Sequence, residues 1–598
     1  MSRNEELRET QAPTVPLFQD EEAQERVDYV MRDFGEKQLW RNTTASQWEE
    51  VAEIADPNSS NTFFYGNYNW PGQKKTQRQI DATGQMAGEK FKAICDSLLT
   101  PRNMFWHGLA SEHPDVMKDR RARLWFEELT HTLFRLRYAA TANFASQNQM
   151  QYHHLGFYGT GGMFIDEYFA PHSSYRGFRY CNVPLGQLFI GENHQGVIDN
   201  FTRWFRLSAR QAKMMFPQAW EQGLLRACET AGAAHSETKF NFLHHVCLRM
   251  DDYDPSRVDH KGKPFASYYV SIENKTLLEE GGYRTMPLAA SRYIQAPNET
   301  YGRSPAMQVL PALKTLNAEK ATFLKQGHRV VDPILLTYDD GLNTPNLRPG
   351  AFNKGFMTAD GKPLVSVLPT GEIQISKEMM AEEKSIILDA FMVTLFQILT
   401  ETPQMTATEV IERTNEKGIL LAPTVGRQQS EYLGPLIARE IDLALALRLV
   451  PPPPGIIIEA SKAGIGYDVV YTSPISRAMK AQEAAGFMRT VESVKELVNI
   501  TGDPSLLDPF NFDVAIPAIS RIQAVPESWM ADEMMITQKR QARAKSQAQQ
   551  AQIQALPAQA AMIKAQATVA KNQPGIAPGQ SFGGPQQAPP QGGPPGPG

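Results

Sequence analysis

The 598-residue sequence contains few cysteines, and those present are far apart. The four are Cys95, Cys181, Cys228 and Cys247, and none belongs to a Cys-x-x-Cys pair. This spacing suggests neither a disulfide framework nor a cysteine zinc site. Free thiols in a reducing cytoplasm are the expected state.

A long apolar run is also missing. The longest apolar tract, residues 385–400, carries Asp389 and is too short to cross a bilayer. The first sixteen residues, MSRNEELRETQAPTVP, are polar and lack the apolar core of a signal peptide. We therefore expect a soluble protein that is made inside the cell and has no membrane partner.

The sequence lacks the common catalytic signatures. Neither His-Glu-x-x-His nor Gly-x-Ser-x-Gly occurs. Tyr158–Gly162 reads YGTGG, but no lysine follows it, and Met163–Ile165 has the composition of a strand. Walker A needs Gly-Lys-Ser/Thr at the start of a helix. The sequence thus predicts a glycine turn at a hairpin, not a phosphate loop.

Metal-ligand patterns are equally weak. Asp251, Asp252 and Asp254 form an acidic cluster, but it lacks the glycine and the glutamate that an EF-hand places at positions six and twelve. The adjacent histidines of the pairs 153–154 and 244–245 point away from each other on a strand or a helix. We predict no catalytic residue, no cofactor and no metal ion, and hence no enzyme.

Composition favours a folded chain with several domains. Of the residues, 42% are hydrophobic and 21% are charged, and 598 residues exceed one ordinary core. Apolar spacing predicts helices and short strands in alternating blocks, which indicates an α+β fold. Helices are expected at 21–41, 77–99, 118–146, 208–229, 304–327, 377–399, 407–416, 425–449 and 475–500, and strands within 163–204, 242–249, 265–272 and 285–294.

Two segments carry clear helix-start signals. Ser304 is a good N-cap, and Pro305 stands where a first-turn proline sacrifices no hydrogen bond. Thr406 and Glu409 have the spacing of a capping box. Pro311, inside the first of these helices, is expected to bend it.

These segments, together with several others in a fixed order, resemble one protein family. The quoted stretches are Tyr158–Gly161, Pro184–Gly186 through Arg203–Phe205, Glu299–Met307, Met405–Arg413, Gly426–Arg439 and Tyr471–Pro474. Over residues 20 to 535 the chain resembles the head-to-tail connector, or portal protein, of short-tailed, podovirus-type bacteriophages. The resemblance implies a portal fold with a helix-rich wing, stem and crown and a small β-rich clip, assembled as a ring of twelve copies.

Placed on this sequence, the resemblance implies a definite order of domains. The expected boundaries are a disordered arm (1–20), the first part of the wing (21–207), a stem helix (208–235), the clip (236–303), a second stem helix (304–329), the second part of the wing with a possible channel loop (330–400), the crown (401–535), and an Ala/Gln helix with a Pro/Gly-rich disordered tail (536–598). Within the last segment, Pro557 and the Ala/Gln content of 538–571 argue against a long coiled barrel.

The implied function is a channel at one capsid vertex through which viral double-stranded DNA is packaged and ejected. Implied partners are further copies of the chain, a terminase motor, the major capsid and scaffolding proteins, a tail adaptor and the passing DNA. The implied place is the head-tail junction of the virion, with the host cytoplasm as the site of assembly. The alternatives are a packaging ATPase-nuclease and another virion structural protein, such as a scaffold or tail component.

Charge is compatible with a DNA channel. The net charge of −5 argues against a general nucleic-acid coat, and a conduit needs few phosphate contacts because each adds friction as well as affinity. The candidate DNA-channel residues are Lys314, Lys320, Lys325 and Arg329, on the helix that begins at Ser304. A solvated surface face is the simpler interpretation of these four cations. In a ring, each would instead become a circle of positive charge.

Overall fold

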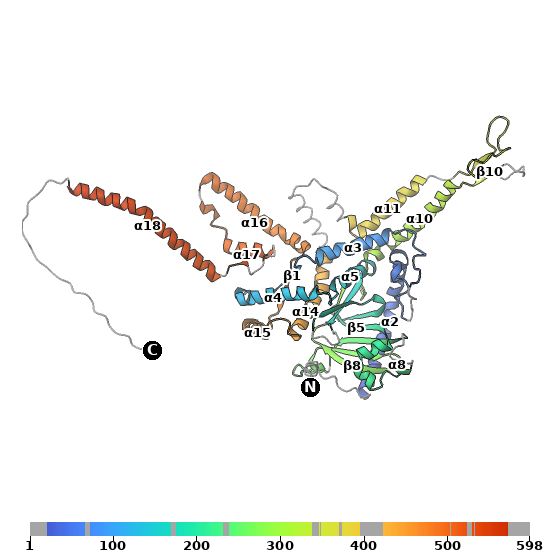
Figure 1. Ribbon diagram of the computed structural model, residues 1–598, viewed down its shortest axis with the longest axis horizontal. Coiled ribbons are helices and arrows are strands. Elements are labelled where there is room, and N and C mark those ends of the chain that lie inside the picture. Colours follow the sequence, from blue (N-terminus) through green and yellow to red (C-terminus); the bar gives the residue numbers. More distant parts are fainter. Residues whose placement is uncertain are drawn as a thin grey trace, which may run out of the picture. The chain divides into compact units, whose positions relative to one another are not determined.

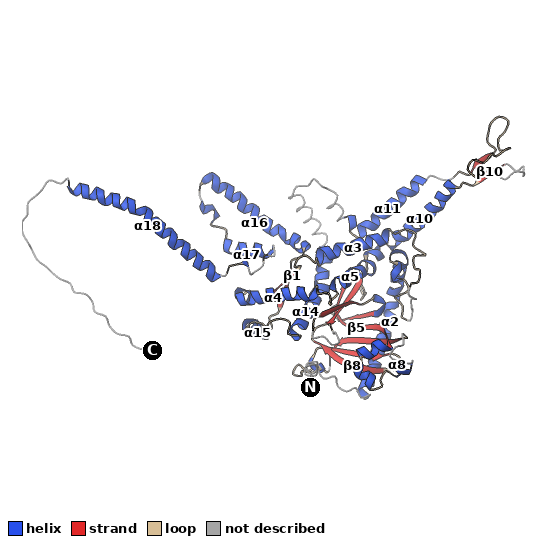
Figure 2. Cartoon of the chain, viewed as in Figure 1, coloured by secondary structure: helices blue, strands red, loops and turns tan. Residues whose placement is uncertain are grey.

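A computed structural model of the chain describes most residues from Glu21 to Lys571 (Figures 1 and 2). The arm predicted over 1–20, the tail over 572–598 and the capping box at Thr406 and Glu409 lie outside the described residues. The chain divides into two units, 1–527 and 528–598, which are described separately. Further gaps are 66–71, 169–174, 231–237, 251, 338–345, 347, 370–372, 395–421, 503, 523–524, 526–528 and 532.

Two antiparallel sheets form the centre of the larger unit (Figure 2). One has the order β4-β5-β6-β7-β8 and the other the order β3-β2-β9. Together with the surrounding helices they confirm the predicted α+β class. The strands are β2 (Thr160–Glu167), β3 (Phe178–Asn182), β4 (Leu188–Glu192), β5 (Ile198–Ser208), β6 (Lys239–Leu248), β7 (Phe265–Ser271), β8 (Thr276–Tyr283) and β9 (Leu288–Arg292).

The clip predicted over 236–303 requires a separate β-rich module. The strands of this segment instead belong to the two central sheets. Strand β6 pairs with β5, so that Phe201 faces Val246 and Ser208 faces Lys239. Strand β9 pairs with β2 of the other sheet. Strands β6 and β9 are therefore joined by backbone pairing to β5 and β2, which precede the predicted clip in the sequence. Alternation of apolar residues identifies a strand but not its partner, which is why the sequence did not show this.

The segment 208–235, expected as a stem helix with a kink or break at Pro217, forms three short helices in its described part. These are α6 (Ala209–Met215), α7 (Pro217–Glu221) and α8 (Arg226–Thr230). The break at Pro217 is confirmed: α6 ends at Met215, because the residue before a proline is disfavoured in helical conformation. One continuous helix over 208–235 is not present. Phe216 packs with Phe205 and Phe242 in one apolar cluster, so these helices cover the five-stranded sheet.

Two long helices connect the sheets to the rest of the core. Helix α5 (Phe144–Tyr158) is buried along 151–158 and contacts α3 (Thr83–Leu99), β2 and β3. Helix α2 (Glu21–Ala55) belongs to two apolar clusters. Its first half packs with Phe189 and Trp204 of the five-stranded sheet, and its second half lies in the main core.

A helical arm leaves the core (Figure 1). Helices α10 (Leu310–Val331) and α11 (Ile373–Ala390) run side by side, and the antiparallel strands β10 (Leu335–Thr337) and β11 (Val365–Val367) lie at the far end. The predicted start of the helix at Ser304 is confirmed, since α9 (Pro305–Gln308) begins there and α10 follows after a break at Val309.

Part of the predicted crown, 401–535, lies in the main core. Helix α14 (Gly434–Ala446) buries Leu436 and Ile437 completely. Strand β12 (Tyr467–Tyr471) pairs with β1 (His107–Ser111), far away in the sequence. Further helices in the described part of the larger unit are α4 (Arg120–Arg137), α15 (Gly455–Lys462), α16 (Pro474–Thr501) and α17 (Phe512–Ile522).

The described part of the smaller unit contains helix α18 (Glu533–Lys571). The sequence predicted a helix over 538–571 without an apolar face, and the helix is confirmed. Every described side chain from Met534 to Gln550 is exposed, and so are those of 562–564. This helix therefore buries no apolar stripe within the described part of the chain.

Candidate functional site

Two glycine turns of the family resemblance lie against each other at the base of the arm. Gly159 ends α5 in the left-handed region, with φ of 75°. A Cβ atom on Gly159 would lie 2.5 Å from the carbonyl oxygen of Gly302, and one on Gly302 would lie 2.3 Å from that of Gly159. Neither turn has space for a side chain, so this contact requires glycine at both positions.

Backbone and side-chain hydrogen bonds hold the two turns together. The Tyr293 amide donates to the Gly159 carbonyl at 2.9 Å, and the Gly302 amide donates to Thr160 Oγ1 at 2.8 Å. The indole of Trp48 donates to the Tyr158 carbonyl at 3.0 Å. The Tyr158–Gly162 turn joins helix α5 to strand β2, so the predicted hairpin is wrong. The turn serves instead to hold the segment at Gly302 against the end of α5.

Ser304 connects this contact to the arm. Its buried hydroxyl oxygen accepts from the Met307 amide at 2.9 Å, as an N-cap does, and its O–H donates to the Phe157 carbonyl at 2.8 Å. One side chain thus starts α9 and fixes it to the end of α5. The direction in which α10 leaves the core follows from this attachment.

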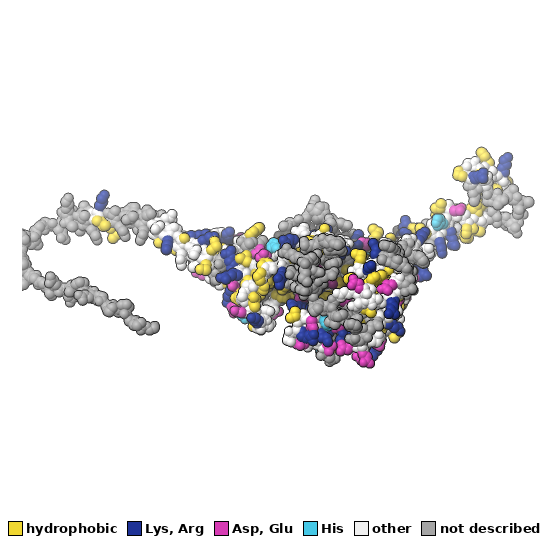
Figure 3. All heavy atoms as spheres, turned by 60° about the horizontal axis from the view of Figure 1, so that its bottom comes forward, with side chains coloured by type: hydrophobic (Ala, Val, Ile, Leu, Met, Phe, Trp, Pro, Cys, Tyr) yellow, Lys and Arg dark blue, Asp and Glu magenta, His cyan; other side chains and the backbone are white. Residues whose placement is uncertain are grey.

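The four predicted channel residues all lie on α10, but not on one face. At about 100° per residue, Lys314, Lys325 and Arg329 fall within about 60° of each other, whereas Lys320 is roughly 120–180° away from them. Lys314 forms a half-exposed ion pair with Glu50 at 2.6 Å, and Lys320 Nζ lies 5.8 Å from the Phe323 ring. Lys325 and Arg329 are exposed, and Figure 3 shows Lys and Arg side chains along this arm.

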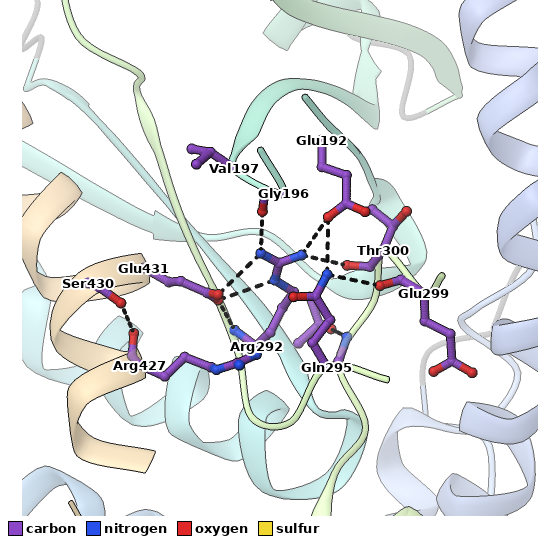
Figure 4. Close-up of polar contacts among 12 residues, drawn as sticks. Glu192, Gly196, Val197, Arg292, Gln295, Glu299, Thr300, Arg427, Ser430 and Glu431 are labelled. Carbon is purple, nitrogen blue, oxygen red and sulfur yellow. Dashed lines mark hydrogen bonds and ion pairs between the residues drawn. The ribbon is translucent and has the colours of Figure 1, made fainter. Parts of the chain in front are cut away.

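Arg292, at the end of β9, joins four segments of the core (Figure 4). Its Nη1 donates to Glu192 Oε2 at 2.7 Å, and its Nη2 donates to the Gly196 carbonyl at 2.8 Å and to Glu431 Oε1 at 3.1 Å. A further bond reaches the Thr300 carbonyl at 3.4 Å. With 3% of its side chain exposed, Arg292 ties the residues before α9 to the helix that carries Glu431.

Glu431 lies in the π-helical turn η5 (Gln429–Leu433), directly before α14. The Gly434 amide bonds to the Gln429 carbonyl, five residues back, and Tyr471 Oη donates to the same carbonyl at 3.0 Å. Pro435 lacks an amide hydrogen and its ring would clash with the carbonyl of residue 431 in a regular helix. The wider turn removes this conflict, and such turns are common at functional positions.

A buried ion pair fixes the other side of α14. Both Arg137, on α4, and Glu440 are fully buried, and Arg137 Nε donates to Glu440 Oε1 at 2.9 Å. Burial would lower the pKa of Arg137, but the Glu440 carboxylate holds that pKa above its ordinary value. Tyr180, on β3, also donates to Glu440 Oε1 at 2.6 Å. The arginine and tyrosine together compensate the buried carboxylate.

Asp56 satisfies two buried groups near the glycine contact. Its Oδ2 accepts from Tyr158 Oη at 2.7 Å and lies 2.8 Å from His153 Nε2. Burial acts to raise the pKa of Asp56, but hydrogen bonding and the charge of His153 lower it to about 2. The carboxylate therefore stays ionised and supports the turn at Tyr158.

The two histidines of the pair 244–245 point to different strands, as predicted for adjacent residues of a strand. On β6, His244 Nε2 lies 3.0 Å from Ser267 Oγ, and His245 Nδ1 lies 2.8 Å from Thr202 Oγ1, on a different neighbouring strand. No group of three or more possible metal ligands occurs among the described residues, and Asp251 lies outside them. In the same part of the chain, no helix has the length and apolar character that a bilayer span requires.

Sequence reasoning missed Arg292, Arg137 and their carboxylate partners. The partners are far away in the chain, at separations of 139 residues for Arg292–Glu431 and 303 for Arg137–Glu440. The available signal was an isolated arginine in an apolar strand or on the buried face of a helix. Such a residue is rarely buried without an acidic partner.

Comparison with known proteins agrees with the resemblance. Residues 35–530 match the family described as bacteriophage head to tail connecting protein. The chain is 24% identical to the portal protein of Salmonella phage epsilon15, over 89% of this chain and 93% of that protein. It is also 24% identical to a probable portal protein of Bordetella phage BPP-1, over 81% and 85%.

One solved structure, the neck of an empty GTA particle computed with C6 symmetry, aligns with 71% of this chain and 90% of that chain at 12% identity. Its TM-score of 0.31 is too low to support an argument. The family match spans both sheets, the arm and α14. The chain belongs to the bacteriophage head to tail connecting protein family.

Proposed function

We propose that this chain is a portal subunit, copies of which form a ring at one capsid vertex through which double-stranded DNA enters and leaves the particle. The family match over 35–530 carries this proposal. The curated relatives, which cover most of the chain, have portal protein or probable portal protein as their names. Head-to-tail contacts that close into a ring allow one sequence to build such a channel.

The arm is the best candidate for the stem and the clip. Helices α10 and α11 would be the two stem helices, and the segment between them, which contains β10 and β11, would be the clip. In support, α10 buries only Leu313 and Leu316 of its side chains, and the two helices are neighbours. Residues 208–303, which we first took for stem and clip, would then belong to the wing.

The basic face of α10 would line part of the channel. Lys314, Lys325 and Arg329 share this face, and ring symmetry would repeat each charge around the axis. Lys320 lies on another face and would contact a neighbouring copy or the solvent. The arm would thus supply a modest positive lining within a chain of net charge −5.

The partners follow from this arrangement. A terminase motor, a separate chain, would dock on the distal end of the arm, and a tail adaptor would replace it after packaging. Major capsid and scaffolding proteins would surround the ring during assembly in the host cytoplasm. The finished ring would remain at the head-tail junction of the virion and would perform no catalysis itself.

The first test is the assembly state of the full chain. Native mass spectrometry with negative-stain electron microscopy should show closed rings with an axial hole, of about twelve copies according to the family resemblance. A stable monomer under capsid-assembly conditions, filaments or a closed particle would contradict the proposal.

A second test asks whether the position of a lysine on α10, and not only its charge, matters for DNA transit. Lys325→Gln should leave rings intact but change the amount of DNA packaged or retained, because the charge faces the channel. Lys320→Gln is the matched control, with the same chemical change on a different face of α10. Equal effects of the two substitutions, or no effect of either, would refute the assignment of the channel face.

A further inference from the structure

Positive charge is concentrated in the C-terminal unit. Residues 528–598 contain six Lys and Arg but only two acidic residues, Asp532 and Glu533, which gives a net charge of +4. Since the whole chain carries −5, residues 1–527 carry −9. The two units of one chain therefore differ in the sign of their charge.

Most of this charge forms a compact group on α18, here named the basic cluster: Lys539, Arg540, Arg543 and Lys545. No acidic residue follows Glu533 in the helix. Every described side chain of the helix from Met534 to Gln550 is exposed. At about 100° per residue, the first three members of the cluster lie within an arc of about 100°.

The helix around the cluster has little apolar packing in its described part. Alanine and glutamine fill most of the next two turns, and the described side chains bury no apolar stripe. Neighbouring cations on a helix repel each other, so this arrangement destabilises an isolated α18 slightly. An anionic partner would remove that repulsion.

We propose that the basic cluster of α18 binds the phosphate backbone of double-stranded DNA without sequence preference. Duplex DNA presents one negative charge per about 1.7 Å of its axis, so an exposed helix face with several cations meets several phosphates at once. Arginine adds bidentate hydrogen bonds to phosphate, which lysine does not provide. The contact lies on a different unit from α10 and does not depend on the proposed channel.

The chemistry of α18 favours DNA over a membrane surface. A helix that lies in a membrane interface needs a continuous apolar face opposite its cations. On α18, the exposed Met535 and Ile536 lie just before the basic cluster, but at about 100° per residue they fall on the same side of the helix as the first three of its cations and not opposite them. The exposed Met562 and Ile563 are far away in sequence, with mostly Ala and Gln between. The charges alone would give only weak, salt-sensitive binding to anionic lipid.

The test uses the full chain and a 30-base-pair duplex in fluorescence anisotropy at several salt concentrations. With about four phosphates contacted, affinity should fall about 100-fold between 50 and 200 mM salt. The variant Lys539→Gln/Arg540→Gln/Arg543→Gln/Lys545→Gln should bind more weakly, and its salt slope should decrease by about 3.6. Glutamine has a helix propensity close to those of Lys and Arg, so circular dichroism should be unchanged.

A charge-preserving control keeps the test specific. In Lys539→Arg/Arg540→Lys/Arg543→Lys/Lys545→Arg the number of cations is unchanged, and duplex binding should persist with the original salt slope. An unchanged affinity and slope in the glutamine variant would overturn the proposal. So would binding to vesicles that contain anionic lipid, or to polyglutamate, without binding to the duplex.

Discussion

Replacing Gly159 with alanine should weaken the attachment of the arm to the core. The new Cβ would lie 2.5 Å from the Gly302 carbonyl oxygen and 2.6 Å from the Ser304 amide nitrogen. These are backbone atoms, so no side-chain rotation relieves the clash. The left-handed φ of 75° adds a cost of about 1–2 kcal/mol for any residue other than glycine.

The clash adds a second cost. Overpacking of a closely packed site typically costs about 1–3 kcal/mol, so the total should be roughly 2–5 kcal/mol. Gly223→Ala is the matched control, because Gly223 has φ of 69° and nothing within 4 Å of the position of a Cβ. The control should show the conformational cost alone, about 1–2 kcal/mol.

Urea unfolding followed by far-ultraviolet circular dichroism measures the difference between the two variants. The midpoint of the first transition should fall further for Gly159→Ala than for Gly223→Ala, because only the first variant meets backbone. Hydrogen exchange should also become faster at the amides of α9 and the first turn of α10. Equal midpoints, with unchanged exchange in α9, would show that the two turns do not approach each other as described.

Three further predictions concern buried charge. Arg137→Met should destabilise the chain by about 3–5 kcal/mol, since Glu440 would remain buried without its arginine, and the urea midpoint reports this. Burial lowers the pKa of both His154 and His245 to about 3. Histidine in the unfolded chain titrates near 6.5, so the two neutral histidines should contribute fully to the free energy of unfolding above pH 6.5. Below that pH the contribution should be lost by up to about 1.4 kcal/mol per pH unit for each histidine. The urea midpoint should therefore decrease from pH 7 to pH 5, and His245→Gln should make this decrease smaller. Arg292→Lys should keep the charge but lose the several simultaneous bonds, and faster hydrogen exchange in η5 would be the readout.

The sequence predicted those features that depend on a few neighbouring residues. The helix start at Ser304 was found, because a cap needs only residues three positions apart. The α+β class followed from apolar spacing in the same way. The helix expected over 538–571, without an apolar face, was also recognised, although α18 begins earlier, at Glu533.

Features that depend on distant partners were not predicted. Apolar alternation located β6 and β9 but could not show that they pair with β5 and β2, which is why the sequence placed a separate β-rich module over 236–303. The four lysine and arginine candidates were correctly placed on one helix, and their division between two faces follows from helix geometry. Their role in a channel remains a prediction.

The arm brings these points together, because it is well attached at one end and sparsely packed at the other. Ser304 and the contact between Gly159 and Gly302 fix its base. Its distal half exposes large apolar side chains at the end of α10 and in the segment with β10 and β11. These are Leu324, Val330, Val331, Ile334, Leu336 and Val367. Exposed apolar groups of this kind mark a surface that another chain covers.

We therefore expect hydrogen exchange to be slow at the base of α10 and fast at its end in a single subunit, and slow along the whole helix once rings form. Slow exchange at the end of α10 in a single subunit would mean that the arm is stable alone and does not need neighbouring copies.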